Sequence, residues 1–296
     1  MFNPVQISND GTRAVFAYTP PEVDDVGDQT TKVVVLDLTS GGQVGATLSV
    51  AGQGAAQLSG DSSKLVVNSG IYDTVTGRTT TVISVYNAAT GAQIGTGATA
   101  GDTATILPAQ FNDAGTRAIV TGYGIASGSL SGVRVIVIDT ATGEQVGSAV
   151  TVAGSPVGFN PVNGDLPLPI QLVANGTRAV VTTAPTGTTS NFAVINTTTG
   201  AQIGTTLNLT GTVTFNVEDT DTYLTPLFNA DDSRAFLTTV TGTAASGYTT
   251  RIALLDTATG LQVGTTITLT GAPGHLCRRL QPRRCREPGR VLHQCR

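Results

Sequence analysis

Apolar residues recur along this chain in two patterns. Residues 133–138 and 252–255 are nearly continuous apolar runs, whereas residues 205–210 and 265–270 alternate polar and apolar side chains. A short continuous run is typical of a strand covered on both faces, and a period of two is typical of a half-exposed strand. The two patterns together predict sheets whose inner strands are covered on both faces and whose outer strands face water on one side.

These strands belong to a unit that occurs five times. Each copy contains Asp or Asn, three further residues, Gly, one residue, Gln, then Val or Ile, and a second Gly; the copies lie at 33–45, 85–95, 136–147, 193–204 and 253–264. The aligned Asp and Asn residues are Asp37, Asn87, Asp139, Asn196 and Asp256, at spacings of 50, 52, 57 and 60 residues. A second marker of the type D-G-T-R-A-V precedes each copy, at 9–16, 60–67, 113–120, 174–181 and 230–237. Each unit is therefore expected to hold a short strand, a turn, an apolar strand and a hairpin of two more strands.

A repeat of this kind constrains the fold. One four-stranded sheet cannot cover both of its own faces, so neighbouring units must stack on each other. Four antiparallel strands per unit, covered inside and half-exposed outside, are typical of a β-propeller blade. The sequence predicts an all-β β-propeller array of about five four-stranded antiparallel blades over residues 1–271, in a ring that need not be complete.

The repeated polar and glycine residues are expected to shape turns. An Asp or Asn side chain can accept backbone N–H bonds two or three residues further on, and Gly adopts positive φ without strain. We assign this structural role to Asp37, Asn87, Asp139, Asn196 and Asp256, together with Gly91, Gly143, Gly200 and Gly260. The alternative, a ring of carboxylates around a cation, is disfavoured because turn closure accounts for both the residue types and their spacing.

The pattern D-G-T-R-A-V-V-T-T followed by V-A-V-I-D-T-A-T-G-x-Q-V-G resembles the YVTN-type β-propeller repeats of secreted and surface-layer bacterial proteins. The resemblance covers all five units, about residues 4–271, and it is specific for the fold. It implies an extracellular or cell-envelope location. It says little about function, because one fold hosts many functions.

Composition excludes several kinds of chemistry. Residues 1–271 contain no His and no Cys, so no Ser-His-Asp triad, Cys-His nucleophile, or imidazole or thiolate metal site is expected there. Their 9 Lys and Arg against 19 Asp and Glu leave a balance of −10, which disfavours nucleic-acid binding. No apolar run is long enough to span a membrane, and we expect no cofactor. A pair of catalytic Asp residues from different blades stays open, although no motif points to it.

The segments that differ between units are the expected ligand-binding loops, since propellers carry function in their loops. They lie at 20–31, 122–132, 155–169 and 212–226. Two are acidic and resemble fragments of calcium loops, with Asp24, Asp25 and Asp28 in one and Glu218, Asp219 and Asp221 in the other. Neither has the spacing of a calcium loop with its distal Glu, so we interpret both as solvated acidic loops.

Residues 272–296 differ from the rest of the chain. They hold seven Arg, all three Cys (Cys277, Cys285, Cys295) and both His (His275, His293). A small zinc site and a basic arm are two interpretations. We favour a third, a frameshift, because permitted codons in another frame spell a blade-like segment with a P-D-G turn. The tail is then expected to be disordered, and the open ring to expose Val and Ile on the faces beside the gap.

The beginning of the chain also resembles an internal segment, because Phe-Asn-Pro-Val at 2–5 recurs at 159–162. We therefore expect a fragment of a longer propeller. The predicted function is non-enzymatic binding or scaffolding, with a protein or carbohydrate ligand held by the blade loops. The alternatives are a propeller-type enzyme, such as a lactonase-like hydrolase or a quinoprotein, and a purely structural repeat.

Overall fold

The structure is a computed structural model, and it describes residues 5–8, 10–20, 29–75, 78–101, 103–126, 129–156, 169–184, 188–217, 220–243 and 246–272. These residues form strands and the turns and loops between them, and among them there is no helix. The all-β prediction is therefore confirmed. Residues 273–296 of the tail lie outside the described residues. The zinc, basic-arm and frameshift interpretations of the tail therefore stay predictions.

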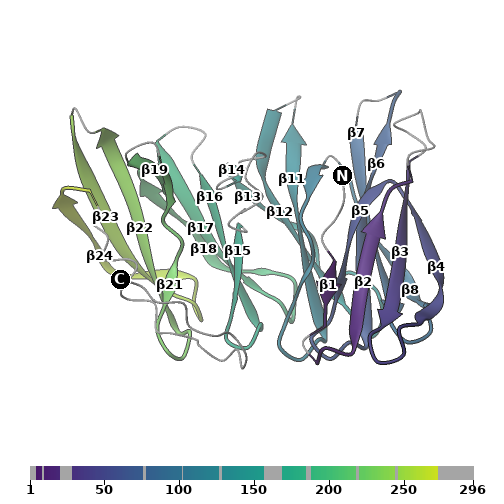
Figure 1. The fold of residues 1–296 in the computed structure, drawn as a ribbon. Coiled ribbons are helices and arrows are strands. Elements are labelled where there is room, and N and C mark those ends of the chain that lie inside the picture. Colours follow the sequence, from purple (N-terminus) through teal and green to yellow (C-terminus); the bar gives the residue numbers. More distant parts are fainter. Residues whose placement is uncertain are drawn as a thin grey trace, which may run out of the picture.

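Apart from one two-stranded hairpin, the described strands form five antiparallel sheets that follow one another along the chain, and we call them blades 1 to 5 (Figure 1). Blade 1 contains β1 (Gln6–Ile7), β2 (Arg13–Tyr18), β3 (Thr30–Asp37) and β4 (Gln43–Ala51). Blade 2 contains β5 (Gln53–Leu58), β6 (Lys64–Asp73), β7 (Arg78–Asn87) and β8 (Gln93–Ala100). Blade 3 contains β9 (Thr103–Ile106), β10 (Gln110–Phe111), β11 (Arg117–Ala126), β12 (Ser129–Asp139) and β13 (Val150–Ala153).

The last two blades follow the same order. Blade 4 contains β14 (Ser155–Pro156), β15 (Ile170–Val173), β16 (Arg178–Ala184), β17 (Thr189–Asn196) and β18 (Gln202–Thr210). Blade 5 contains β21 (Leu227–Phe228), β22 (Arg234–Thr243), β23 (Gly247–Asp256) and β24 (Leu261–Thr270), and it is preceded by the hairpin of β19 (Thr214–Val217) and β20 (Thr220–Tyr223). Each blade has the four-strand antiparallel order that the repeat predicts, and together they form a β-propeller array.

Blades 3 and 4 have five strands because their first strand is broken into two pieces. In blade 3, both β9 and β10 pair with β11, on the same edge of the sheet. In blade 4, β14 and β15 likewise both pair with β16. The break interrupts the strand and leaves the four-strand plan of the blade intact.

The blades stack face to face, and each junction holds one cluster of buried apolar side chains. Alternate residues of a strand enter different clusters: in β11, Ile119 packs against blade 4, while Ala118 and Val120 pack against blade 2. This is the physical reason for the continuous apolar runs. Residues 133–138 lie in such a doubly covered strand, as predicted.

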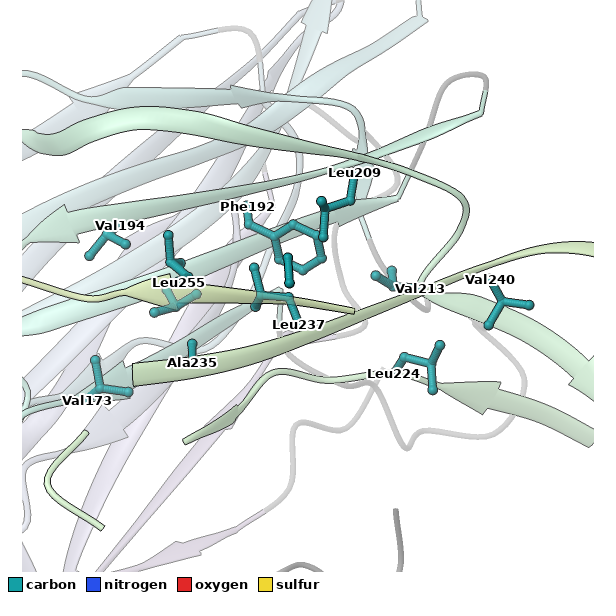
Figure 2. Packing of buried hydrophobic residues seen from close by; sticks show 12 residues of the cluster. Val173, Phe192, Val194, Leu209, Val213, Leu224, Ala235, Leu237, Val240 and Leu255 are labelled. Carbon is teal, nitrogen blue, oxygen red and sulfur yellow. The ribbon is translucent and has the colours of Figure 1, made fainter. Parts of the chain in front are cut away.

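Figure 2 shows the cluster between blades 4 and 5. Phe192 and Leu209 from blade 4 lie beside Leu237 from blade 5, and each of the three is at most 3% exposed. Val213 and Leu224, at the base of the β19–β20 hairpin, extend this cluster.

The array is open. Among the described residues, no strand pairing joins blade 1 to blade 5. For this reason β3 and β23 are each covered on one face only, so the double coverage predicted for 252–255 is wrong. Val34 and Leu36 in blade 1, and Ile252 and Leu254 in blade 5, remain half-exposed.

Candidate functional site

The five repeated Asp and Asn side chains lie at equivalent turns between the third and fourth strands of their blades. The Oδ1 atom of each accepts two backbone N–H bonds, from the residues two and three positions further on, at 2.8–3.1 Å. These residues are Asp37, Asn87, Asp139, Asn196 and Asp256. Amides and carboxylates occur at the same position, so the shared requirement is an acceptor oxygen and not a negative charge.

The glycines four residues after these side chains complete the turns. In each unit the glycine N–H donates to the backbone carbonyl of the Asp or Asn at 2.8 Å. Their φ angles lie between +66° and +73°, a region that favours glycine. They are Gly41, Gly91, Gly143, Gly200 and Gly260.

Two of the turn carboxylates also form an ion pair with an arginine, through the oxygen that does not bind the turn. Arg117 Nη1 lies 2.7 Å from Asp139 Oδ2, and Arg234 Nη1 lies 2.7 Å from Asp256 Oδ2. The backbone N–H groups of the turn hold the pKa of Asp37 and of Asp256 below the usual range, with a smaller contribution from the neighbouring Arg13 and Arg234. Asp37 and Asp256 are thus ionised at neutral pH, and each is hydrogen-bonded within its own turn.

The second marker of each unit forms a corner at the same end of the blade, since Arg13 pairs with Asp37 and Arg234 with Asp256. We call this end of the array the turn end and the opposite end the loop end. At the blade 1 corner, Asp10 Oδ1 accepts hydrogen bonds from Ser8 Oγ at 2.6 Å and from Ser62 Oγ of blade 2 at 3.0 Å. The Ser8 hydroxyl is the main cause of the lowered pKa of Asp10.

Replacing Asp139 with alanine is expected to lower the free energy of unfolding by about 1–2 kcal/mol, because two turn N–H groups lose their acceptor and Arg117 loses its partner. Asp139→Asn keeps the acceptor and loses only the partly exposed ion pair, so a loss of about 0.5 kcal/mol or less is expected. Urea unfolding of the full chain measures both. Equal losses in the two variants would show that charge, and not turn closure, is the requirement at this position.

The second glycine of each repeat copy, eight residues after the Asp or Asn, has a role at the blade junctions that the sequence did not predict. These glycines are Gly45, Gly95, Gly147, Gly204 and Gly264. Three of them face the first glycine of the next blade at such short range that a Cβ on either partner would overlap backbone: the pairs are Gly95 with Gly143, Gly147 with Gly200, and Gly204 with Gly260. The constant four-residue spacing between the two glycines was the available signal in the sequence.

The segments predicted as ligand loops are only partly described by the structure. The loop between β2 and β3 falls largely within 21–28, outside the described residues, and so does most of 155–169. The acidic pair Glu218 and Asp219 also lies outside them. The segment 122–132 is mostly strand and not a loop, because its described residues are the end of β11 and the start of β12, which pair with each other.

The segment 212–226 is an insertion in the first strand of blade 5. At its start, Thr212 and Val240 exchange backbone hydrogen bonds. After its end, Leu227 pairs with Phe236. The backbone of Leu224 donates to Val213 O at 2.7 Å and closes the base of the β19–β20 hairpin. Blade 4 is interrupted in the same way, between β14 and β15. In both blades 4 and 5, the chain therefore leaves and rejoins the first strand, which is the edge strand of its sheet.

Three further observations concern metal binding, membrane spans and ionisation. Within the described ranges, no three His, Cys, Asp or Glu side chains lie close enough to hold a metal ion. In the same part of the chain, no helix has the length and apolar character needed to cross a membrane. Burial raises the pKa of Tyr123 to about 12, which keeps this phenol neutral in the cluster between blades 3 and 4.

No protein-family model and no curated protein sequence matches the chain. Solved structures that resemble it include TolB from Acinetobacter baumannii, with 16% identity over 92% of this chain and 54% of TolB and a TM-score of 0.37. The β-propeller domain of the trilobed protease from Pyrococcus furiosus is 11% identical over 88% of this chain and 70% of that chain, with a TM-score of 0.45. The acylaminoacyl peptidase of Pyrococcus horikoshii is 12% identical over 89% of this chain and 39% of its own, with a TM-score of 0.44.

The chain thus spans about half the length of the TolB chain that it resembles. At these identities and TM-scores, the likenesses carry no argument about function. The propeller assignment rests on the strand order and face-to-face packing of the blades in this chain.

Proposed function

We propose that the chain is a non-enzymatic binding or scaffolding module of a secreted or cell-envelope bacterial β-propeller of the YVTN type. One observation carries the proposal: the polar side chains that recur in every unit are engaged in closing its turns. Their Oδ1 atoms each hold two backbone N–H groups, and Asp139 and Asp256 also hold an arginine. Turn closure therefore explains why the Asp and Asn side chains recur in every unit. We assign ligand recognition to the segments that differ between units.

The proposed ligand is a protein or a carbohydrate, held by the loops and by the first-strand insertions of blades 4 and 5. An extracytoplasmic location follows from the resemblance of the repeats to the YVTN type. We propose no cofactor and no catalytic residue. We also retain the hypothesis that the natural propeller contains more blades than these five.

The β19–β20 hairpin offers a direct test. Its base is closed by the Leu224–Val213 hydrogen bond, so residues 214–223 can be replaced by Gly-Gly with Val213 and Leu224 kept in the core. The full chain and this variant are applied to arrays of purified bacterial cell-wall polysaccharides and of secreted bacterial proteins. At least about a tenfold loss of affinity is expected for the variant, equivalent to about 1.4 kcal/mol of binding free energy.

Glu144→Ala is the matched control, because Glu144 is exposed at the turn end. It is expected to bind like the unmodified chain. In parallel, simple esters and lactones are offered as substrates, and turnover no faster than buffer is expected. Saturable hydrolysis would overturn the proposal in favour of an enzyme, and neither binding nor hydrolysis would favour a purely structural repeat.

A further inference from the structure

The four junctions between blades are built from the same positions of the repeat. Side chains two and four residues before the turn Asp or Asn pack on the following blade, as Ile83 and Val85 of blade 2 and Phe192 and Val194 of blade 4 do. Side chains one and three residues before it pack on the preceding blade. Blade n thus presents one face forward and a different, complementary face backward.

The forward face of blade 5 has no partner among the described residues. Its side chains correspond one by one to side chains that blade 4 packs into its junction with blade 5: Ile252 to Phe192, Ile267 to the partly buried Leu207, and Leu269 to Leu209. Leu209 is 3% exposed, whereas Ile267 is 56% and Leu269 is 49% exposed. Phe236 and Val263 lie on the same face and are also exposed. We call these residues the forward end face.

The backward face of blade 1 is unpartnered in the same way. Ile7 and Leu38 occupy the positions of Leu58 and Ala88 in blade 2, which are buried against blade 1. Ile7 is 59% and Leu38 is 43% exposed. Phe16 stacks on Tyr18 at the same face, with ring centroids 5.6 Å apart. We call these residues the backward end face.

The turn glycines at the two ends of the array also lack a neighbouring blade among the described residues. At three junctions, the second turn glycine of one blade faces the first turn glycine of the next at close range. Gly264 on blade 5 and Gly41 on blade 1 have the same positive φ but no heavy atom within 4 Å of an added Cβ. Gly11 at the blade 1 corner is equally open, whereas its counterpart Gly176 lies directly on Asn112 of the preceding blade.

We propose that the forward end face binds the backward end face of a second copy of this chain, in a head-to-tail contact that continues the blade stack. A second copy supplies at once both missing elements: the apolar side chains and the unmatched glycine turn. Because the two faces differ, the contact is heterologous and leads to a larger ring or an open chain of copies.

The test uses full-length chains that are blocked on one face. Ile267→Lys blocks the forward end face and Ile7→Lys blocks the backward end face; both positions are more than half exposed, so folding is expected to be retained. Sedimentation velocity over a wide concentration range is expected to show concentration-dependent oligomers for the unmodified chain. Each variant alone is expected to be monomeric, and their equimolar mixture is expected to reach the mass of two chains and no more.

Leu269→Lys with Leu38→Lys is a second pair that tests the same two faces, and circular dichroism with urea unfolding verifies that each variant is folded. The proposal is overturned if the unmodified chain stays monomeric, which would favour a further blade of another segment or a different partner. It is also overturned if Ile7→Lys alone forms dimers, which would mean that forward faces pair with each other, or if the mixture of variants stays monomeric.

Discussion

Phe192→Ala is expected to lower the free energy of unfolding by about 3–5 kcal/mol, the range for removing a buried aromatic side chain and leaving a cavity. Phe192 is 1% exposed and lies between blades 4 and 5, against residues from both (Figure 2). The loss therefore affects a junction and not one sheet alone. Urea unfolding monitored by circular dichroism measures it, at a protein concentration low enough to exclude self-association.

Phe236→Ala is the matched control. Phe236 has the same side chain but is 42% exposed on the forward end face, so a loss of about 1 kcal/mol or less is expected. Comparable losses in the two variants would contradict the assignment of Phe192 to a packed junction and of Phe236 to an open face.

Gly260→Ala is expected to be the second most damaging change, at about 2–5 kcal/mol. Two costs combine. A residue with a side chain is strained at φ +66° by about 1–2 kcal/mol, and the new Cβ would also overlap the carbonyl oxygen of Ile203 in blade 4. Relief of that overlap requires the two blades to move apart, at a cost of about 1–3 kcal/mol.

Gly41→Ala separates these two costs. Gly41 has nearly the same φ, +72°, at the equivalent turn, but an added Cβ would meet nothing within 4 Å. We expect only the conformational strain there, so its loss should be smaller than that of Gly260→Ala by about 1–3 kcal/mol. Equal losses in thermal and urea unfolding would mean that the junction tolerates the side chain and that φ alone fixes glycine at this position.

Local sequence was sufficient for the elements of this fold, because strands and turns are encoded within a few residues. The continuous apolar run at 133–138 predicted a strand covered on both faces, and the alternation at 205–210 predicted the half-exposed strand β18. The five spaced Asp and Asn residues marked five units and the position of every turn between third and fourth strands. Such patterns reflect hydrogen bonds within a turn and the alternation of buried and solvent-exposed side chains along one strand.

Only the tertiary structure decided which surfaces meet. The sequence explained Gly143, Gly200 and Gly260 by their φ alone, whereas contact with the preceding blade also requires glycine at these positions. Likewise, Leu209 and Leu269 are the same residue at the same repeat position, yet one is buried and the other is half-exposed. The physical reason is that burial depends on a neighbour 50 to 60 residues away in sequence, or on its absence, and no local pattern records it.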